Sequence, residues 1–535
     1  MKTGLEFAAT AIAAIGFLAS SVTADVDPIV IKGSKFFYQS NGTQFFMKGV
    51  AYQQDVSTNT TVTESVEYRD PLANEANCRR DIPFLQELQT NTIRVYAIDP
   101  AQNHDACMQL LQDAGIYVVA DLSQPGLSIN RDDPAWNDDL YARYTQVVDV
   151  LADYTNTLGF FAGNEVSNQP NNTAASAFVK AAVRDTKAYI AQKGYRKIGV
   201  GYATNDDAII REDMADYFNC GNTEEAIDFW GYNIYSWCGN STYRESGYDR
   251  QTSNFASYSV PVFFAEYGCN QVQPRTFTDV EALYSEPMTD VWSGGIVYMY
   301  FQEANDYGLV EIDGNNVERN EDFTYLSSQI AAATPTGVAM NDYNPTNTVP
   351  ANCPSVAPTW GAASSPLPPT PNKELCECMM DTLTCTIRPS TNEDDFEDLF
   401  GTVCGLSEQA CQGIYHNGTT GEYGAYSMCN AREQLAFAFN QYYQGQRNNP
   451  SACDFGGAAA TQAASSAQGN CAALISQAGT AGTGSVTSVP SGAGGSRSST
   501  AAASAITVPA FNVGLLQLGA YILGATLTGA GMILL

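Results

Sequence analysis

Two acidic residues stand at the ends of apolar runs of strand length. Residues 158–165 read LGFFAGNE and end in Glu165, and residues 260–268 read VPVFFAEYG and carry Glu266 near their end. Cleavage of a glycosidic bond uses two carboxyl groups, one to protonate the leaving oxygen and one to attack or stabilise the sugar cation. The two residues are candidates for such a pair, although a lone carboxylate at a strand end is more often a helix cap or a turn residue.

The segments around these residues predict an α/β fold with a parallel barrel. Short apolar runs alternate with longer, helix-compatible polar segments, as in repeated βα units. Eight such units close a (β/α)8 TIM barrel, in which catalytic residues lie at the C-terminal ends of the strands. Glu165 ends the fourth run and Glu266 ends the seventh, so both fall on that face. The runs cover residues 45–52, 92–98, 116–122, 158–165, 198–204, 229–235, 261–267 and 295–301, and helices are expected over 78–88, 104–113, 138–154, 174–192 and 279–292.

Tyrosines gather near the predicted strand ends and support a sugar-binding site. Their rings can stack on pyranose faces while their hydroxyl groups bond to sugars or orient a carboxylate. For any one of them, packing in the barrel is an equally good interpretation. The residues are Tyr52, Tyr96, Tyr235, Tyr298 and Tyr300.

Charge and histidine content exclude several classes of function. The chain has 57 acidic and 26 basic residues and a net charge of −31, which argues against a nucleic-acid partner because phosphate backbones are bound by clustered Lys and Arg. It has only two histidines, His104 and His416, and neither lies in a nucleophile motif. A Ser-His-Asp or Cys-His mechanism is therefore poorly supported, and we expect neither a metal site nor a cofactor.

Both ends of the chain carry processing signals. Lys2, an apolar stretch over 7–19 and the small residues of 22–24 predict a signal peptide over 1–24. Residues 513–535 are uncharged and long enough to cross a bilayer, and they follow a small-residue segment. This order predicts a glycosylphosphatidylinositol (GPI) anchor rather than a retained membrane anchor, with a propeptide over 501–535 that is removed. The candidate attachment residues are Gly494, Gly495 and Ser496.

The glycosylation sequons and the cysteines of the chain agree with secretion. The five Asn-x-Ser/Thr sequons are at Asn41, Asn59, Asn171, Asn240 and Asn417, and 14 cysteines predict disulfide bonds. With the anchor signal, these features predict localisation at the outer face of the plasma membrane.

Cysteine spacing and composition divide the chain. We expect a catalytic domain over 25–335, a linker or strap over 336–372, a cysteine-rich module over 373–473 and a Ser/Gly/Ala-rich stalk over 474–500 that is too low in hydrophobic content to fold. Cys353 in the strap is expected to bond to the first domain, which holds five other cysteines.

The cysteine-rich module allows two interpretations, which stay equally open. Residues 423–444 are aromatic and helix-compatible, so some rings could form a sugar platform, although most are expected to be core. The module could instead only brace the barrel, because a disulfide framework explains its sequence without any ligand.

With these features in hand, the chain resembles the fungal 1,3-β-glucanosyltransferases of glycoside hydrolase family 72, in the subgroup whose C-terminal module is similar to carbohydrate-binding module family 43. The resemblance rests on GNE at 163–165, on AEYG at 265–268 and on the order of signal peptide, barrel, strap, module and anchor signal. It implies that Glu165 is the general acid/base and Glu266 the nucleophile.

The resemblance also implies roles for the neighbouring residues. Asn164 would contact the sugar next to the scissile bond, and Tyr235 would donate a hydrogen bond to the nucleophile. The remaining implied subsite residues are Tyr96, Asp121, Tyr298 and Gln53. The implied disulfides are Cys78–Cys107, Cys220–Cys353 and Cys238–Cys269.

The implied reaction is a retaining double displacement on β-1,3-glucan, with glucan chains as donor and acceptor. Water at the second step would give hydrolysis, and the hydroxyl group of another glucan would give a longer chain. The residues alone do not choose between these outcomes, so transfer rests on the resemblance. A hydrolytic endo-β-1,3-glucanase and a non-catalytic wall-binding protein remain the alternatives, and we expect a monomer.

Overall fold

The computed structural model describes residues 26–54 and 68–487. The expected signal peptide, the sequon at Asn59, the candidate anchor residues and the apolar C-terminal stretch lie outside the described residues. Among the helices that are described, none is both long and apolar enough to cross a membrane.

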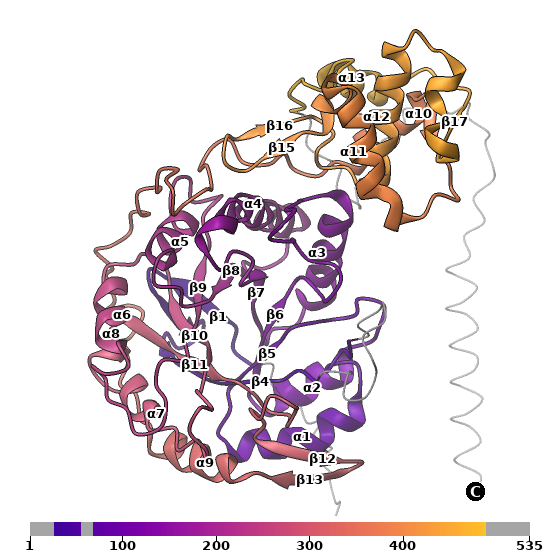
Figure 1. Cartoon of the computed structure of the whole chain (residues 1–535). Coiled ribbons are helices and arrows are strands. Elements are labelled where there is room, and N and C mark those ends of the chain that lie inside the picture. The colour runs from indigo at the N-terminus through magenta and orange to yellow at the C-terminus, as the bar shows by residue number, and fades with distance from the viewer. Residues whose placement is uncertain (1–25, 55–67, 488–535) are drawn as a thin grey trace, which may run out of the picture. The chain divides into compact units, whose positions relative to one another are not determined.

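Eight parallel strands form a closed barrel, with helices outside the ring of strands (Figure 1). Every predicted apolar run overlaps one strand of the barrel, so the predicted barrel is confirmed. The last strand begins and ends earlier than predicted, and Tyr298 and Tyr300 follow it rather than belonging to it. In order around the barrel, the strands are β10 (Val262–Tyr267), β11 (Trp292–Val297), β4 (Met47–Ala51), β5 (Thr92–Val95), β6 (Tyr117–Asp121), β7 (Thr157–Asn164), β8 (Gly199–Thr204) and β9 (Phe229–Asn233).

The helices follow the predicted pattern with one break. The single helix expected over 279–292 is two short helices, because Pro287 lacks the backbone N–H that a continuous helix needs and disfavours a helical residue before it. The helices of this domain are α1 (Glu75–Glu87), α2 (Asp105–Asp113), α3 (Asp138–Leu151), α4 (Ser176–Lys193), α5 (Arg211–Phe218), α6 (Tyr248–Phe255), α7 (Asp279–Leu283), α8 (Met288–Val291) and α9 (Glu321–Ala332).

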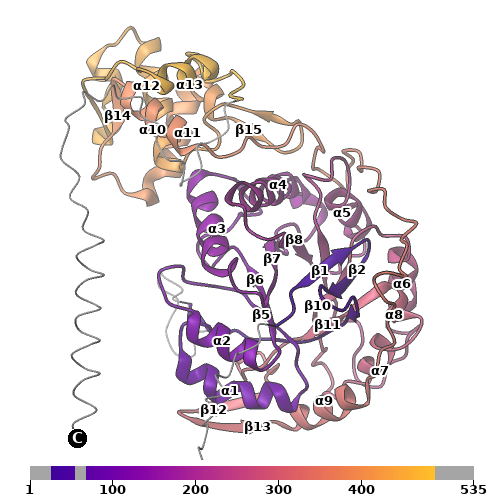
Figure 2. The ribbon, with the colours of Figure 1, turned by 180° about the vertical axis from the view of Figure 1, so that it is seen from behind.

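A small antiparallel sheet covers the N-terminal ends of the barrel strands (Figure 2). It consists of β1 (Ile29–Lys32), β2 (Lys35–Tyr38) and β3 (Gln44–Phe45). The ring of Phe36 packs against Phe229 and Phe263, which lie at the beginnings of β9 and β10, with ring centroids 6.2 and 6.1 Å apart. This end of the barrel is therefore filled by aromatic side chains, which leaves the opposite end for the site. A hairpin of β12 (Val310–Asp313) and β13 (Asn316–Arg319) precedes α9.

The strap is bonded to the barrel, and the module is built on disulfides. Cys353 pairs with Cys220, and the other two bonds of the first domain are Cys78–Cys107 and Cys238–Cys269, the same three pairs that the resemblance implies. The module carries the pairs Cys376–Cys429, Cys378–Cys471, Cys385–Cys453 and Cys404–Cys411. Its elements are α10 (Lys373–Thr382), β14 (Cys385–Ile387), α11 (Phe396–Leu406), β15 (His416–Asn417), β16 (Glu422–Tyr423), α12 (Ala431–Gly445), β17 (Ala459–Thr461) and α13 (Asn470–Ala478).

The helix expected over 423–444 begins later, at Ala431. Asn430 is its N-cap and Glu433 completes a capping box, which satisfies the first N–H groups of the helix at that point. Most rings of this segment are core, as expected, because four of the six are buried: Tyr426, Phe437, Phe439 and Tyr443.

The prediction that the chain is an unfolded stalk from residue 474 is wrong for its first part. The helix α13 continues to Ala478 and buries Leu474 and Ala478 in the module core. Beyond it, the carbonyl oxygen of Gly482 accepts a hydrogen bond of 2.7 Å from the backbone N–H of Ala425. Two buried apolar side chains and backbone bonding are sufficient to order this low-complexity segment.

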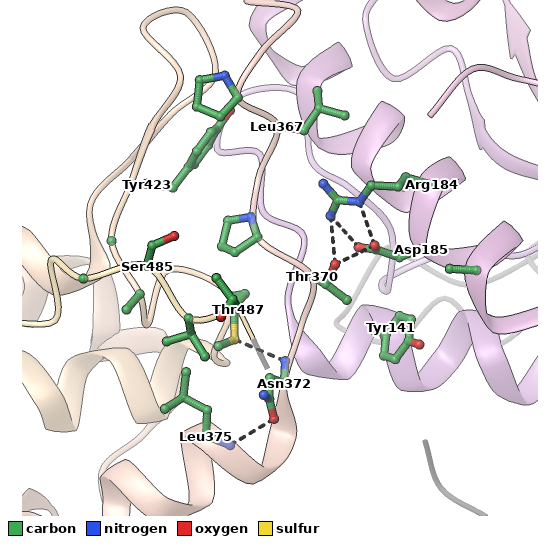
Figure 3. A pocket seen from close by; sticks show the side chains of 18 of the residues that line it. Tyr141, Arg184, Asp185, Leu367, Thr370, Asn372, Leu375, Tyr423, Ser485 and Thr487 are labelled. Carbon is green, nitrogen blue, oxygen red and sulfur yellow. Dashed lines mark hydrogen bonds and ion pairs between the residues drawn. The ribbon is translucent and has the colours of Figure 1, made fainter. Parts of the chain in front are cut away.

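A polar clamp and a cavity mark the joint between barrel, strap and module (Figure 3). Arg184 on α4 forms an ion pair with Asp185 and donates to the carbonyl oxygen of Pro368 and the hydroxyl of Thr370 in the strap. The cavity beside this clamp has a volume of about 520 Å³. The backbone N–H of Asp138, at the start of α3, donates a 3.0 Å hydrogen bond to the carbonyl oxygen of Met428 in the module.

Candidate active site

The barrel brings the two glutamates to the same face. Glu165 follows β7 directly, and Glu266 is the second-to-last residue of β10, so both lie at C-terminal strand ends. Burial raises the pKa of Glu266, and the charge of Glu165 adds to that rise.

Glu266 is held by three donors in a buried setting, with 8% of the residue exposed. Its Oε1 accepts from the hydroxyl of Tyr96 at 2.8 Å and from Arg94 Nη1 at 3.2 Å, and its Oε2 accepts from the hydroxyl of Tyr235 at 2.8 Å. Burial raises the pKa of Glu266 above its ordinary value, while Arg94 and the two tyrosines oppose that rise. The donors keep the carboxylate oriented and favour its charged form.

Arg94 is the central cation of the site, and the sequence analysis missed it. It lies in β5 with no exposed surface, forms two hydrogen bonds with Asp121 at 3.0 and 3.1 Å and donates to Asn164 Oδ1 at 3.0 Å. Its guanidinium also lies over the ring of Tyr96, 4.3 Å from the centroid. The only local signal was a charged residue inside an apolar strand run, TIRV.

Every polar group of Glu165 except one carboxylate oxygen has a partner. The residue has a left-handed backbone, with φ +49°, which is uncommon for a side chain of this kind. Its N–H donates to the carbonyl oxygen of Ala203 at 2.9 Å, and its carbonyl oxygen accepts from Arg131 Nη2 at 2.7 Å. Its Oε1 accepts from Asn233 Nδ2 at 2.8 Å.

Asn164 and Asn233 connect the two carboxylates. The Oδ1 atom of Asn164 accepts from both Arg94 and Asn233, each at 3.0 Å, and these donors bond in turn to Glu266 and Glu165. One network therefore sets the relative position of the two acids. A buried, oriented carboxylate linked to a second carboxyl group on the same barrel face is an arrangement suited to attack on a sugar carbon and protonation of its leaving group.

The predicted tyrosines separate into two groups. Tyr96, Tyr235 and Tyr298 lie together, and the Tyr298 ring meets both others edge to face with centroids 6.4 and 6.5 Å apart. In contrast, Tyr52 and Tyr300 are buried and both donate to Asp81, which makes them packing residues. Tyr307, which the sequence analysis did not select, packs against Tyr235 and Tyr298.

Gln53 and Asp121 are at the site, but their polar atoms form hydrogen bonds with other groups of the protein. The Oε1 of Gln53 accepts from the backbone N–H groups of Tyr96 and Ala97, and its Nε2 donates to the carbonyl oxygen of Arg69. Both oxygens of Asp121 accept from Arg94. These contacts support Tyr96 and Arg94.

Among the residues that the structure describes, one group has the spacing of metal ligands: Cys376, Cys429 and Glu433. Its two cysteines form a disulfide with each other, so they offer no thiolate to a metal ion. The group lies in the module and is not part of the site on the barrel.

Comparison with protein-family models gives two matches along the chain. Residues 18–334 match the model of glycoside hydrolase family 72, described as glucanosyltransferase. Residues 383–460 match the model of the X8 domain. The first match contains both glutamates and every strand of the barrel, and the second lies within the cysteine-rich module.

Curated proteins and solved structures show the same similarity over nearly the whole chain. A 1,3-beta-glucanosyltransferase of Arthroderma benhamiae is 60% identical and the alignment covers 100% of both chains. The 1,3-beta-glucanosyltransferase gas1 of Schizosaccharomyces pombe is 47% identical over 90% of this chain and 87% of its own. A mutant apostructure of Saccharomyces cerevisiae Gas2p superposes with a TM-score of 0.77 at 43% identity, covering 84% of this chain and 96% of that one.

Proposed function

The chain belongs to the glucanosyltransferases of glycoside hydrolase family 72, and we propose that it cleaves a β-1,3-glucan internally and transfers the new reducing end to the non-reducing end of another glucan. The result is elongation of cell-wall glucan. The observation that carries this proposal is the pair Glu165 and Glu266 on one barrel face, joined by a single hydrogen-bond network.

In the first step, Glu266 attacks the anomeric carbon while Glu165 protonates the leaving glucan oxygen. Tyr96, Tyr235 and Arg94 hold the attacking carboxylate in place, so little reorientation is needed as the covalent bond forms. In the second step, Glu165 acts as the base that deprotonates the acceptor. This retaining mechanism needs carboxyl groups about 5–5.5 Å apart.

The acceptor decides between transfer and hydrolysis. Both outcomes share one glycosyl-enzyme and one pair of carboxylates. The tyrosine cluster of Tyr96, Tyr235, Tyr298 and Tyr307 supplies aromatic surface on which an acceptor sugar can stack beside Glu266. A bound acceptor makes the second step effectively intramolecular and favours the sugar hydroxyl over water.

The proposal is tested by incubating the secreted chain with a reduced β-1,3-glucan oligosaccharide and following product sizes. We expect products longer than the starting chain. Glu266→Gln should lose activity by several orders of magnitude while retaining glucan binding, because the amide keeps the shape of the side chain but is not a nucleophile. Only shorter products would mean that the enzyme is a hydrolase, and full activity of the variant would remove Glu266 from its role.

We also propose the cellular placement of the enzyme. A signal peptide over 1–24 and the C-terminal signal would deliver a monomeric, GPI-anchored enzyme to the outer face of the plasma membrane. Seven disulfide bonds among the described residues support passage through an oxidising compartment. Release of the native protein from intact cells by a phosphatidylinositol-specific phospholipase would test the anchor, and resistance to it would favour a retained tail.

A further inference from the structure

The backbone of Glu165 is held in a conformation that it would not adopt alone. Its φ of +49° lies in the left-handed region, where non-glycine residues persist only if their surroundings hold them. Two hydrogen bonds do so at this position. The N–H donates to the carbonyl oxygen of Ala203 in β8, and the carbonyl oxygen accepts from Arg131 Nη2 at 2.7 Å.

The direction of the Glu165 carboxylate depends on this backbone. The carbonyl group and the side chain branch from the same Cα atom, so rotation of the backbone redirects the carboxylate. In the observed conformation its Oε1 lies 2.8 Å from Asn233 Nδ2, which joins it to the network of Glu266. Arg131 donates to the peptide oxygen of Glu165 and not to its carboxylate.

The loop that carries Arg131, residues 122–137, is anchored at both ends. At its start, the N–H of Leu122 donates to the carbonyl oxygen of Phe161 at 3.0 Å. At its end, the buried ring of Trp136 donates from Nε1 to Asp185 Oδ2 at 2.8 Å. Asp185 is the residue that Arg184 and Thr370 also bind at the joint with the strap (Figure 3).

The cysteine-rich module contacts the same loop. His416 Nε2 lies 3.8 Å from Asp133 Oδ1, two residues after Arg131, and this contact lowers the pKa of Asp133. Directly after the loop, the carbonyl oxygen of Met428 accepts from the N–H of Asp138 at 3.0 Å. The loop therefore lies between the barrel that it serves and the module that supports it.

We propose that Arg131 is a positioning residue for Glu165, and that the cysteine-rich module contributes by supporting the loop of residues 122–137. The inference rests on the proposed acid/base role of Glu165. Arg131 holds the peptide of Glu165 in its left-handed conformation and so keeps the carboxylate aimed at the glycosidic oxygen. The module then supports catalysis through this loop, in addition to any role in binding sugar.

The test compares leaving groups, since only a poor leaving group needs protonation. On β-1,3-glucan oligosaccharides, Arg131→Ala should lower kcat about 10- to 100-fold with little change in KM, the scale expected for a misplaced catalytic group. On a dinitrophenyl glycoside of the same glucan, the initial burst of dinitrophenolate should stay close to the wild-type rate. Azide should restore turnover, because it attacks the glycosyl-enzyme without a general base.

Three variants complete the design. Asp132→Ala removes an exposed side chain from the same loop and should behave as the wild type. Arg131→Lys keeps a donor and should retain more activity than Arg131→Ala. Glu165→Ala should show the strongest dependence on the leaving group; if it shows none, the proposed role of Glu165 has failed, whatever Arg131 does.

An equal loss of rate by Arg131→Ala on both substrates, with no response to azide, would overturn the positioning role.

The contribution of the module is tested by His416→Ala and Asp133→Ala. The Asp133 side chain of this contact is 90% exposed, so kcat should fall only about two- to fivefold, with the same dependence on the leaving group. If these two variants keep the wild-type kcat, or lose kcat equally with good and poor leaving groups, the module has no part in positioning Glu165.

Discussion

Tyr235 and Tyr96 donate to opposite oxygens of Glu266, and both hydrogen bonds favour its charged form. Tyr235→Phe should therefore raise the pKa of the nucleophile, because the charged form loses a donor while burial remains. The acidic limb of the kcat/KM profile should move to higher pH, and kcat/KM at its optimum should fall about tenfold. Initial rates of glucan cleavage between pH 3 and 8 measure both effects.

Tyr307→Phe is the matched control for that variant. The Tyr307 ring packs against Tyr235, with centroids 5.7 Å apart, but its hydroxyl does not bond to Glu266. Its profile should follow the wild type. If both variants shift the acidic limb equally, packing of the rings and not the hydrogen bond controls the nucleophile.

At this scale the sequence predicted the two acids, and the resemblance implied the hydrogen bond from Tyr235 to Glu266, but Arg94, Arg131 and Asn233 were missed. Glu165 and Glu266 stand at strand ends, which is a local pattern that can be recognised. Arg94, Arg131 and Asn233 act through contacts with residues that are distant in the chain, such as Arg94 with Asn164. The charge inside the apolar run of Arg94 is the only local signal, and it does not tell which acid the arginine binds.

At the scale of elements, the joint between α3 and α12 holds acidic groups from both sides. Burial raises the pKa of Glu433 from 4.5 to about 7, and the charge of Asp138 adds to the rise. Burial likewise raises the pKa of Asp138 to about 6. Since the folded state binds these protons more tightly than the unfolded state, their contribution to stability is complete below about pH 4 and is lost as pH rises through 6 to 7.

Glu433→Gln removes one of these ionisations and keeps the side-chain oxygen that accepts from Asn430. We expect the difference in free energy of unfolding between variant and wild type to be about 1–2 kcal/mol more favourable to the variant at pH 8 than at pH 5. Thermal unfolding at the two pH values measures the difference. The exposed Glu397→Gln should show no such pH dependence, and an equal response of both variants would contradict the prediction.

Regular elements were predicted well where periodicity was strong. All eight barrel strands were predicted, because a parallel strand buried on both faces reads as an apolar run. The helix over 279–292 was predicted as continuous although Pro287 interrupts it, and residues 423–430 were assigned to a helix that starts after the Asn430 cap. Both errors arose at helix boundaries, one at a proline and one at an N-cap.

At the scale of the whole molecule, the Cys220–Cys353 bond joins the strap to the barrel across a sequence separation of 133. Replacing both cysteines by alanine should lower the free energy of unfolding by about 5 kcal/mol, from the chain entropy of the closed loop. The midpoint of thermal unfolding should fall by about 10 °C or more.

The Cys404–Cys411 bond provides the comparison, since it closes a separation of only 7 residues. Its removal should cost about 2 kcal/mol by the same estimate. Equal losses for the two double variants would mean that native-state strain or contacts, and not the closed loop, determine what these bonds contribute.

The charges around Arg94 change during the proposed reaction. In the free enzyme, one buried guanidinium faces two carboxylates, Asp121 and Glu266, so the cluster carries an excess negative charge. Formation of the glycosyl-enzyme turns Glu266 into a neutral ester and leaves Arg94 and Asp121 as a balanced pair. Burial disfavours uncompensated charge, so the cluster is electrostatically relaxed only while it carries the sugar. We expect this relaxation to stabilise the glycosyl-enzyme and so to give a second glucan time to arrive.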